Sequence, residues 1–529
     1  MPSYYKDFRE YLAVLEEKGK LRRIKRPVNK DTEIHPLVRL QFRGCEESQR
    51  TAFLFENVVD VKGVKYDMPV AVGCMAASKD IYALGMQCAP EEIGAKWGRA
   101  LVKPIPPTVV SRGPVQEVVH SGADLGTKFG LHSLPIPIST PGFDNAPYTT
   151  ASHWVSRDPE TGTRNLGNYR GQAKSPLRIG CCAGLGLRTH WKKWKKLGKK
   201  EMDAAIVIGV TPNLSYTATA RVPEEVEEYG VAGGIAGAPV ELVQCKTVDL
   251  QVPAQAEIVI EGKMSTEELE MEGPFGEFPG FMAQRSLNLF MDVTCIIHRT
   301  SPIYVAFISQ FPPSESSVLR GVAREQLVRK FLSVDCKLKG IRQVSLHEST
   351  GSWGLCVVQI DQREGGKGGE VLKAMKGAKH HLSKWVVVVD EDINPQDADA
   401  VNWAMSFRVQ PKRDTEVIDM YAMPLDPSLY RSGERIDMTA ENMGASALLI
   451  DATRKWPYPP VSLPAQPYME QALKIWKEEG LPALSLKEPW FGYSMGYWTE
   501  EDVEEANLAL KGEHFQTGEK QAKSQRKKV

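Results

Sequence analysis

The chain has 529 residues, of which 42% are hydrophobic and 25% are charged, and its 66 basic and 66 acidic residues cancel to a formal net charge of zero. This length suits two or three domains with separate cores, and the composition excludes a disordered or fibrous protein. Zero net charge argues against a general attraction to nucleic acid, and no apolar run reaches the about 18 residues of a membrane span. The nine cysteines include no C-x-x-C pair, which is typical of reduced thiols. We therefore expect a cytoplasmic protein that binds neither nucleic acid nor membranes.

The N-terminal part of the chain has the pattern of an α/β region. Apolar residues from Phe8 to Leu15 recur at helical spacing, and Gly19 can end that helix. Short strands then alternate with helices until a proline-rich segment at 103–107, which we interpret as a linker. The predicted first region spans residues 1–110.

A β-rich region follows, over residues 111–318. Segments such as 204–208 and 293–297 have the composition of buried strands and are separated by glycine turns. All the chemically informative motifs of the chain lie in or beside this region.

A helix predicted over 319–332 leads into a third region, residues 319–485. Its segments 357–360 and 385–389 are continuous apolar runs, which predicts a parallel sheet between helices. Residues 486–529 form a C-terminal extension, and we expect its last eighteen residues to be a basic, disordered tail.

The most informative segment is Met271–Phe281, with the sequence Met-Glu-Gly-Pro-Phe-Gly-Glu-Phe-Pro-Gly-Phe. Its glycines and prolines impose an irregular backbone that can aim Glu272 and Glu277 at one point, among aromatic rings. Two acids in such surroundings ionise with unequal ease, which is how proteins build a proton donor. The alternative is a surface turn with two solvated glutamates.

Four other segments accompany this block in a fixed order. They are Asn165–Arg170, the stretch Arg188–Trp191 with His190, Glu228–Gly234 and Val252–Gly262. In order and spacing the five segments resemble the UbiD family of prenylated-FMN-dependent (de)carboxylases, from about residue 5 to about residue 480. The resemblance implies a mixed α+β and α/β fold, in which an N-terminal α/β region precedes a central split β-barrel of the FMN-binding type and a C-terminal α/β oligomerisation domain.

The resemblance also implies a cofactor and a metal ion. Prenylated FMN would bind among seven residues: Asn165, Asn168, Tyr169, Arg170, Thr189, His190 and Glu228. A divalent ion (Mn²⁺, Fe²⁺ or Mg²⁺) on Asn165, His190 and Glu228 would bridge to the cofactor phosphate, with K⁺ nearby. An amide oxygen, an imidazole and a carboxylate suit such an ion better than a sulfur-rich zinc site. Taken singly, His190 could be a structural hydrogen-bonding residue and Glu228 part of a solvated acidic turn.

The catalytic residues implied are Arg170, Glu272 and Glu277. A guanidinium can hold one carboxylate with two nitrogens while it contacts a second acid. Because one arginine cannot fully compensate two carboxylates in a dry pocket, one of them should be able to carry a proton. Arg170 could instead make a surface salt bridge.

The reaction implied is the reversible, non-oxidative decarboxylation of an aromatic, heteroaromatic or α,β-unsaturated acid, or of its CoA-linked form. It would pass through a covalent adduct with prenylated FMN, and Glu277 would protonate the product carbon. Phe278 stands where ferulic acid decarboxylases carry a smaller residue, which favours a flat aromatic acid over a cinnamic acid. A flavin prenyltransferase would supply the cofactor, and the family leads us to expect a homodimer or homohexamer.

Two other functions remain open from the residues themselves. One is a metal-dependent hydrolase that uses Asn165, His190 and Glu228 to activate water; the other is a non-catalytic flavin-binding assembly protein. Two further motifs have simpler interpretations. The glycine-rich segment 364–369 is better explained as a strand-to-helix turn than as a phosphate loop. The Lys/Trp run 188–200 is better explained as a solvated helix face than as a site for cofactor or CoA phosphates.

Overall fold

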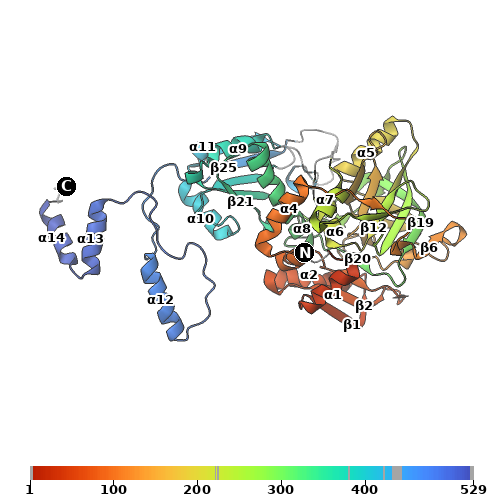
Figure 1. Cartoon of the computed structure of the whole chain (residues 1–529), viewed down its shortest axis with the longest axis horizontal. Coiled ribbons are helices and arrows are strands. Elements are labelled where there is room, and N and C mark those ends of the chain that lie inside the picture. Colours follow the sequence, from red (N-terminus) through yellow and green to blue (C-terminus); the bar gives the residue numbers. More distant parts are fainter. Residues whose placement is uncertain are drawn as a thin grey trace.

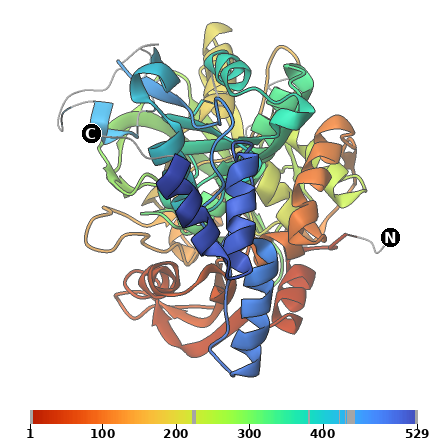
Figure 2. The ribbon, with the colours of Figure 1, turned by 90° about the vertical axis from the view of Figure 1, so that its left-hand side faces the viewer.

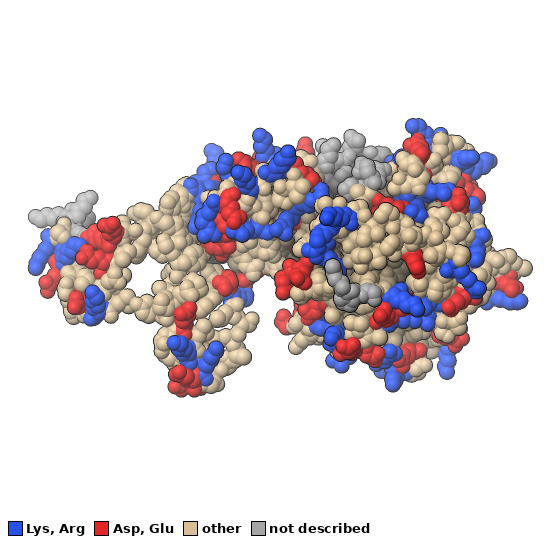
Figure 3. All heavy atoms as spheres, in the orientation of Figure 1, with Lys and Arg blue, Asp and Glu red and all other residues tan. Residues whose placement is uncertain are grey.

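The computed structural model describes residues 4–220, 222, 226–378, 382–420, 423, 425–429, 431 and 444–524. Figure 1 shows the N-terminal region packed beside a central β-rich body, a C-terminal α/β unit next to both, and an arm of helices that extends away from them. On the face seen in Figure 3, basic and acidic side chains are intermixed. No helix among the described residues is both long and apolar enough to cross a membrane. All nine cysteines are free thiols.

The N-terminal region is built on a sheet in the order β1-β2-β4-β20, with β3 paired to the end of β2. The bounds are α1 Phe8–Glu17, β1 Leu21–Asn29, α2 Ile34–Gly44, β2 Ala52–Val59, β3 Lys65–Tyr66, β4 Val70–Val72, α3 Lys79–Met86, α4 Ile93–Val102 and β20 Tyr304–Ala306. The first helix forms as expected: Asp7 accepts a hydrogen bond from Glu10 N, and the apolar face from Phe8 to Leu15 is buried. Strand β20 enters this sheet after the central region, so the chain joins the two regions twice.

The central region contains a ten-stranded sheet whose main path is β7-β10-β11-β19-β15-β12-β8-β9, with β6 and β16 paired to β19. The bounds are β6 Val118–Ser121, β7 Tyr148–Thr149, β8 His153–Arg157, β9 Arg164–Asn168, β10 Gly171–Ser175, β11 Arg178–Cys181, β12 Glu201–Ile208, β15 Ile258–Ser265, β16 Glu270–Glu272 and β19 Ser286–His298. The fold class is confirmed as mixed α and β. The hydrogen-bonded path among the described strands is open, from β7 to β9, and does not close into a complete barrel.

Helices and short strands complete this region. They are β5 Thr108–Val109, α5 Leu185–Lys196, α6 Pro212–Thr219, α7 Glu228–Ala236, β13 Glu241–Gln244, β14 Gln251–Pro253, β17 Phe275–Gly276 and β18 Met282–Ala283. Strands β17 and β18 form a small hairpin that carries the Glu277 turn.

The C-terminal unit has a five-stranded sheet in the order β21-β22-β23-β25-β24. The bounds are α8 Glu315–Lys330, β21 Ile341–Leu346, β22 Leu355–Ile360, α9 Gly368–Lys376, β23 Trp385–Val389, α10 Ala398–Arg408, α11 Pro411–Asp414, β24 Thr415–Asp419 and β25 Ser446–Asp451. The predicted parallel pairing of β22 with β23 is confirmed. One core on this sheet includes residues of α9, and the other includes residues of α10.

The arm carries α12 Gln466–Glu478, α13 Glu500–Leu510 and α14 His514–Ser524, which stand apart from the body in Figure 1 and lie in front of it in the view of Figure 2. The prediction of a disordered tail is wrong for 514–524. This stretch is helical and pairs with α13, as in the 2.8 Å ion pair between Lys520 and Glu501. The prediction rested on the basic composition of the chain end, which does not indicate the pairing with α13. Residues 525–529 lie outside the described part.

Candidate active site

Arg170 contacts both glutamates of the irregular segment. It lies between β9 and β10, and its Nε and Nη2 donate to Oε1 and Oε2 of Glu272 at 2.9 and 2.7 Å. Its Nη1 donates to Oε1 of Glu277. One guanidinium therefore holds one acid with two nitrogens and contacts the other with the third, which is the geometry of a strong, charge-assisted network.

Burial differs between the two acids. Glu272 is 1% exposed and Arg170 is 8% exposed, so this pair is shut off from solvent. The side chain of Asn288 on β19 donates to Oε2 of Glu272 at 3.1 Å, which satisfies that carboxylate further. Glu277 is only half-buried, with 13% of its side chain exposed. Of the two acids, Glu277 is the one that a ligand can reach.

The backbone around the acids is fixed by local contacts. Gly273 has φ of +93°, a conformation that favours glycine. Phe275 lies under the guanidinium, with the Arg170 Cζ 5.1 Å from the ring centroid, and Tyr148 packs on that ring at 4.5 Å. The turn after β17 is closed by hydrogen bonds from Glu277 N to Phe281 O and from Gly280 N to Glu277 O, each 3.0 Å.

Asp144 supports the same hairpin from outside the motif. Its carboxylate accepts from Gly276 N at 3.0 Å and from Thr140 N at 2.7 Å. Burial raises the pKa of Asp144 to about 6, against the opposing effect of these N–H donors.

The three expected metal ligands converge on the β8–β9 ladder. Ser156 pairs with Asn165 across that ladder, and Nδ1 of His190 lies 2.9 Å from Ser156 Oγ. The carboxylate of Glu228 accepts from Leu166 N at 3.0 Å. Burial lowers the pKa of His190 to about 4 and raises the pKa of Glu228 to about 7. The imidazole is therefore neutral at pH 7, as a metal ligand must be.

Several atoms around this group lack partners. Asn165 Nδ2 and Asn168 Oδ1 are buried without a hydrogen-bond partner within the described part of the chain. A Cβ at Gly186 would lie 1.9 Å from Asn165 Oδ1, so the start of α5 has room for that amide only because it is glycine. Where the structure is described, no three His, Cys, Asp or Glu residues are placed to hold a metal ion, so an ion here would also need the amide oxygen of Asn165.

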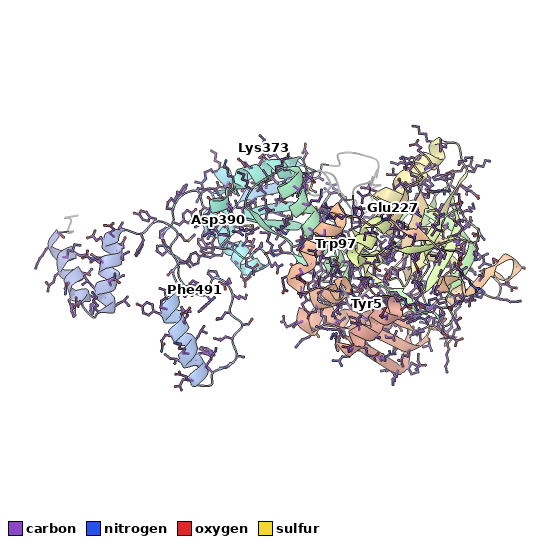
Figure 4. The ribbon with its side chains drawn as sticks, in the orientation of Figure 1. Tyr5, Trp97, Glu227, Lys373, Asp390 and Phe491 are labelled. Atoms are coloured by element: carbon purple, nitrogen blue, oxygen red, sulfur yellow. The ribbon has the colours of Figure 1, made fainter. Side chains whose placement is uncertain are left out.

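The other expected cofactor residues surround the same strand. The Tyr169 ring lies between Gly167 and Gly184, because a Cβ at either position would come within 2.5 Å of the ring or its hydroxyl. Thr189 is half-buried on α5, one residue before His190. Glu227, labelled in Figure 4, precedes the expected ligand Glu228 and pairs with Arg164.

The Lys/Trp run 188–200 and the segment 364–369 have the structures expected from their simpler interpretations. In the Lys/Trp run the tryptophans face the body, since Trp191 and Trp194 Nε1 donate to Ser265 O and Arg157 O at 2.7 and 2.9 Å. Lys192, Lys195 and Lys196 are exposed. Segment 364–369 connects β22 to α9.

Sequence reasoning missed Asn288, Asp144 and Cys182. Asn288 lies opposite Glu270 in the β16–β19 pairing, and no local motif marks it. Cys182 lies near Arg170, and burial raises the pKa of its thiol. None of the three belongs to a recognisable spacing, so only the strand register or the tertiary packing could identify them.

Comparison with known proteins covers nearly the whole chain. Three models of the 3-octaprenyl-4-hydroxybenzoate carboxy-lyase (UbiD) family match it: the N-terminal domain at residues 12–101, the Rift-related domain at 108–312 and the C-terminal domain at 317–452. An uncharacterised protein of Aquifex aeolicus is 35% identical over 85% of this chain and 92% of its own. An uncharacterised protein of Synechocystis is 30% identical over 93% of this chain and all of its own.

Solved structures of two enzymes are similar in fold. An evolved dimeric form of the UbiD-class enzyme HmfF from Pelotomaculum thermopropionicum, in complex with prFMN, has a TM-score of 0.73 and 30% identity, covering 87% of this chain and 97% of its own. The closed form of vanillic acid decarboxylase from Sedimentibacter hydroxybenzoicus has a TM-score of 0.75 and 27% identity, covering 96% of this chain and all of its own. An open form of the latter enzyme has a TM-score of 0.72.

Proposed function

The chain belongs to the UbiD family of carboxy-lyases, and from this premise we propose that it catalyses the reversible, non-oxidative decarboxylation of an aromatic or heteroaromatic acid with prenylated FMN. The observation that carries the proposal is the contact of Arg170 with both Glu272 and Glu277. An α,β-unsaturated acid and a CoA-linked acid remain within the substrate class.

The roles of the three residues follow from their surroundings. Arg170 carries a permanent positive charge and orients an incoming carboxylate while it holds the two acids. Glu272, buried and bound by Arg170 and Asn288, keeps the guanidinium in place. Glu277, the more accessible acid, gives a proton to the carbon from which CO₂ has left. Closure of the C-terminal unit over this loop would exclude water from the carboxylate.

The residues on β9, α5 and α7 fit the expected cofactor and ion. Prenylated FMN supplies the electron sink that loss of CO₂ requires and that side chains lack. Asn165, His190 and Glu228 would hold Mn²⁺, Fe²⁺ or Mg²⁺ at the phosphate, with K⁺ nearby, and the buried Glu228 carboxylate would gain the countercharge it lacks.

The similar solved structures support a narrower class of substrates. HmfF is described in complex with prFMN, and the Sedimentibacter enzyme is a vanillic acid decarboxylase. Together with the aromatic Phe278 after Glu277, this favours a flat ring acid. We expect a flavin prenyltransferase to supply the cofactor and the chain to work as a homo-oligomer.

The test is to coexpress the chain with a flavin prenyltransferase and to record the absorbance spectrum of the purified protein. The holoenzyme is then assayed for CO₂ release and for deuterium exchange on vanillate, on furoic, hydroxybenzoic and cinnamic acids, and on CoA-linked benzoate. We expect a modified-flavin band and turnover of at least one ring acid. Glu277→Gln should keep the band and lose about 100-fold or more in turnover, the scale of a positioned acid.

Other outcomes would identify other functions. Bound metal without flavin, together with ester or amide hydrolysis, would indicate a metal-dependent hydrolase. Bound flavin without turnover of any acid, in either the wild type or Glu277→Gln, would indicate a flavin-binding assembly protein. Either result would overturn the decarboxylase proposal.

A further inference from the structure

The side chain of Phe278, directly after Glu277, is held by the part of the chain that follows the central region. The guanidinium of Arg320, on α8, lies over its ring with Cζ 3.7 Å from the centroid. On this ring also lies Gly351, where an added Cβ would be 3.2 Å from Phe278 Cδ2. The guanidinium therefore stacks on the ring, and the ring leaves no room for a side chain at residue 351.

Arg320 and Gly351 form one support. Arg320 Nη1 donates to Gly351 O at 3.2 Å and to Ser316 O at 3.4 Å, which links α8 to the loop between β21 and β22. Gly351 has φ of +67° and ends a 3₁₀ turn, Glu348–Thr350. Any residue with a side chain there would be strained and would push on the ring.

Phe278 is joined to Glu277 through the backbone of the turn. Phe278 N donates to Oε2 of the adjacent Glu277 at 3.3 Å, and the turn is closed between Glu277 and Phe281. On the other side of the turn, Gly280 (φ +98°) packs against Phe311. Phe278 and Glu277 therefore belong to one hydrogen-bonded turn that is packed on both sides.

We propose that Phe278 is a positioning residue that makes the placement of Glu277 depend on docking of the C-terminal unit. When Arg320 and Gly351 support the ring, Glu277 reaches Arg170; when that unit moves away, the turn loses one of its supports. The inference rests on the proposed function for its consequence in catalysis. Its structural part, the coupling of the turn to α8 and the 351 loop, is independent of the substrate.

The test compares Phe278→Leu and Arg320→Lys with the wild type, each as the coexpressed holoenzyme. Leucine keeps an apolar side chain without a flat ring, and lysine keeps the charge without a planar group that can stack. Phe281→Leu is the matched control, since Phe281 is in the same turn but 59% exposed. Two measurements are made: amide hydrogen exchange of peptides covering 272–285, and kcat and KM on the ring acid turned over fastest.

We expect faster exchange in 276–281 for both variants, including Arg320→Lys, whose substitution lies in another part of the chain. We expect kcat to fall about 10- to 100-fold with KM changed less than about threefold, because the acid is misplaced while binding is retained. The kcat of the double variant should be no lower than that of the more impaired single variant, since both substitutions remove the same contact. The flavin band and the exchange of other peptides should match the wild type.

Unchanged exchange in 276–281 for both variants would overturn the proposal, as would an equal effect of Phe281→Leu. Multiplicative losses in the double variant would also overturn it. If the wild type turns over no acid, the proposed function fails. The exchange measurement then still decides whether the turn depends on Arg320.

Discussion

At the scale of single residues, Arg170 sets the distance between two acids, because it donates to Glu272 through Nε and Nη2 and to Glu277 through Nη1. A lysine ammonium is a point charge that cannot hold one carboxylate with two parallel bonds while it contacts another. We expect Arg170→Lys to lower kcat about 100-fold or more, through misplacement of the proton donor. Steady-state kinetics on the coexpressed holoenzyme measures this, and a variant that kept a third of wild-type kcat would contradict the role given to Arg170.

A second prediction at this scale concerns Glu228. Its carboxylate accepts a hydrogen bond from Leu166 N, burial raises its pKa to about 7, and a divalent cation beside it would offset the cost of burial. Removing divalent ions with a chelator, or substituting Glu228→Gln, should lower the flavin retained per chain after desalting by about tenfold, a 1.4 kcal/mol loss in binding. The adjacent Glu227→Gln is the matched control, because that carboxylate pairs with Arg164 instead. Equal retention in the Glu227 and Glu228 variants would exclude a cation at this position.

At the scale of elements, α8 begins with a buried carboxyl group that joins it to the N-terminal sheet. Glu315 is 0% exposed, and its two oxygens accept from Gly73, Met75, Ala76 and Ile308 N at 3.0 to 3.3 Å. Glutamine has one acceptor oxygen and would leave some of these donors unpaired. We expect Glu315→Gln to destabilise the protein by about 2–4 kcal/mol at pH 5, given about 1–3 kcal/mol for each unpaired buried group.

The effect of this substitution should depend on pH. Burial raises the pKa of Glu315 to about 7, above the unfolded value near 4.5. For such a group the stabilisation is complete below the unfolded pKa and is lost as pH rises through the folded pKa. The difference in unfolding temperature between wild type and Glu315→Gln should therefore shrink from pH 5 to pH 8. A difference that grows over this range would show that the carboxylate is stabilised in its ionised form.

The sequence could predict those elements whose signal is local. The helix from Phe8 follows from its 3.6-residue period, and the β22–β23 pair follows from two continuous apolar runs. The pair Glu272 and Glu277 is equally local, since glycine and proline fix the turn between them. Asn288 and Arg320 are different. Their contacts depend on the β16–β19 register and on the packing of α8 against a distant turn, and neither leaves a pattern in the chain.

At the scale of the whole molecule, the arm exposes apolar side chains that its own chain does not cover. Tyr468 and Ile475, two helical turns apart on α12, are 51% and 50% exposed, and no residue of α12 is buried. Figure 4 shows Phe491 in the same arm, apart from Asp390 in the C-terminal unit. The base of the arm is attached to that unit, where Tyr493 Oη donates to Asp392 at 2.5 Å.

A helix of this length is marginal in water without a packing surface, so the arm should be covered in solution. A second copy of the chain is the partner always present, and an exchanged arm would produce a symmetric contact. We expect light scattering to give the molar mass of an oligomer for the wild type. The double variant Tyr468→Lys with Ile475→Glu should have a molar mass closer to that of the monomer. Because both side chains are exposed, the substitutions should leave the flavin band of the holoenzyme unchanged. Glu470→Lys with Lys474→Glu, on the same helix, is the control for charge, because it too places one new cation and one new anion on α12 and leaves the net charge unchanged. A monomeric wild type, or an oligomer that the double variant does not weaken, would mean that the α12 face is not part of a contact between copies.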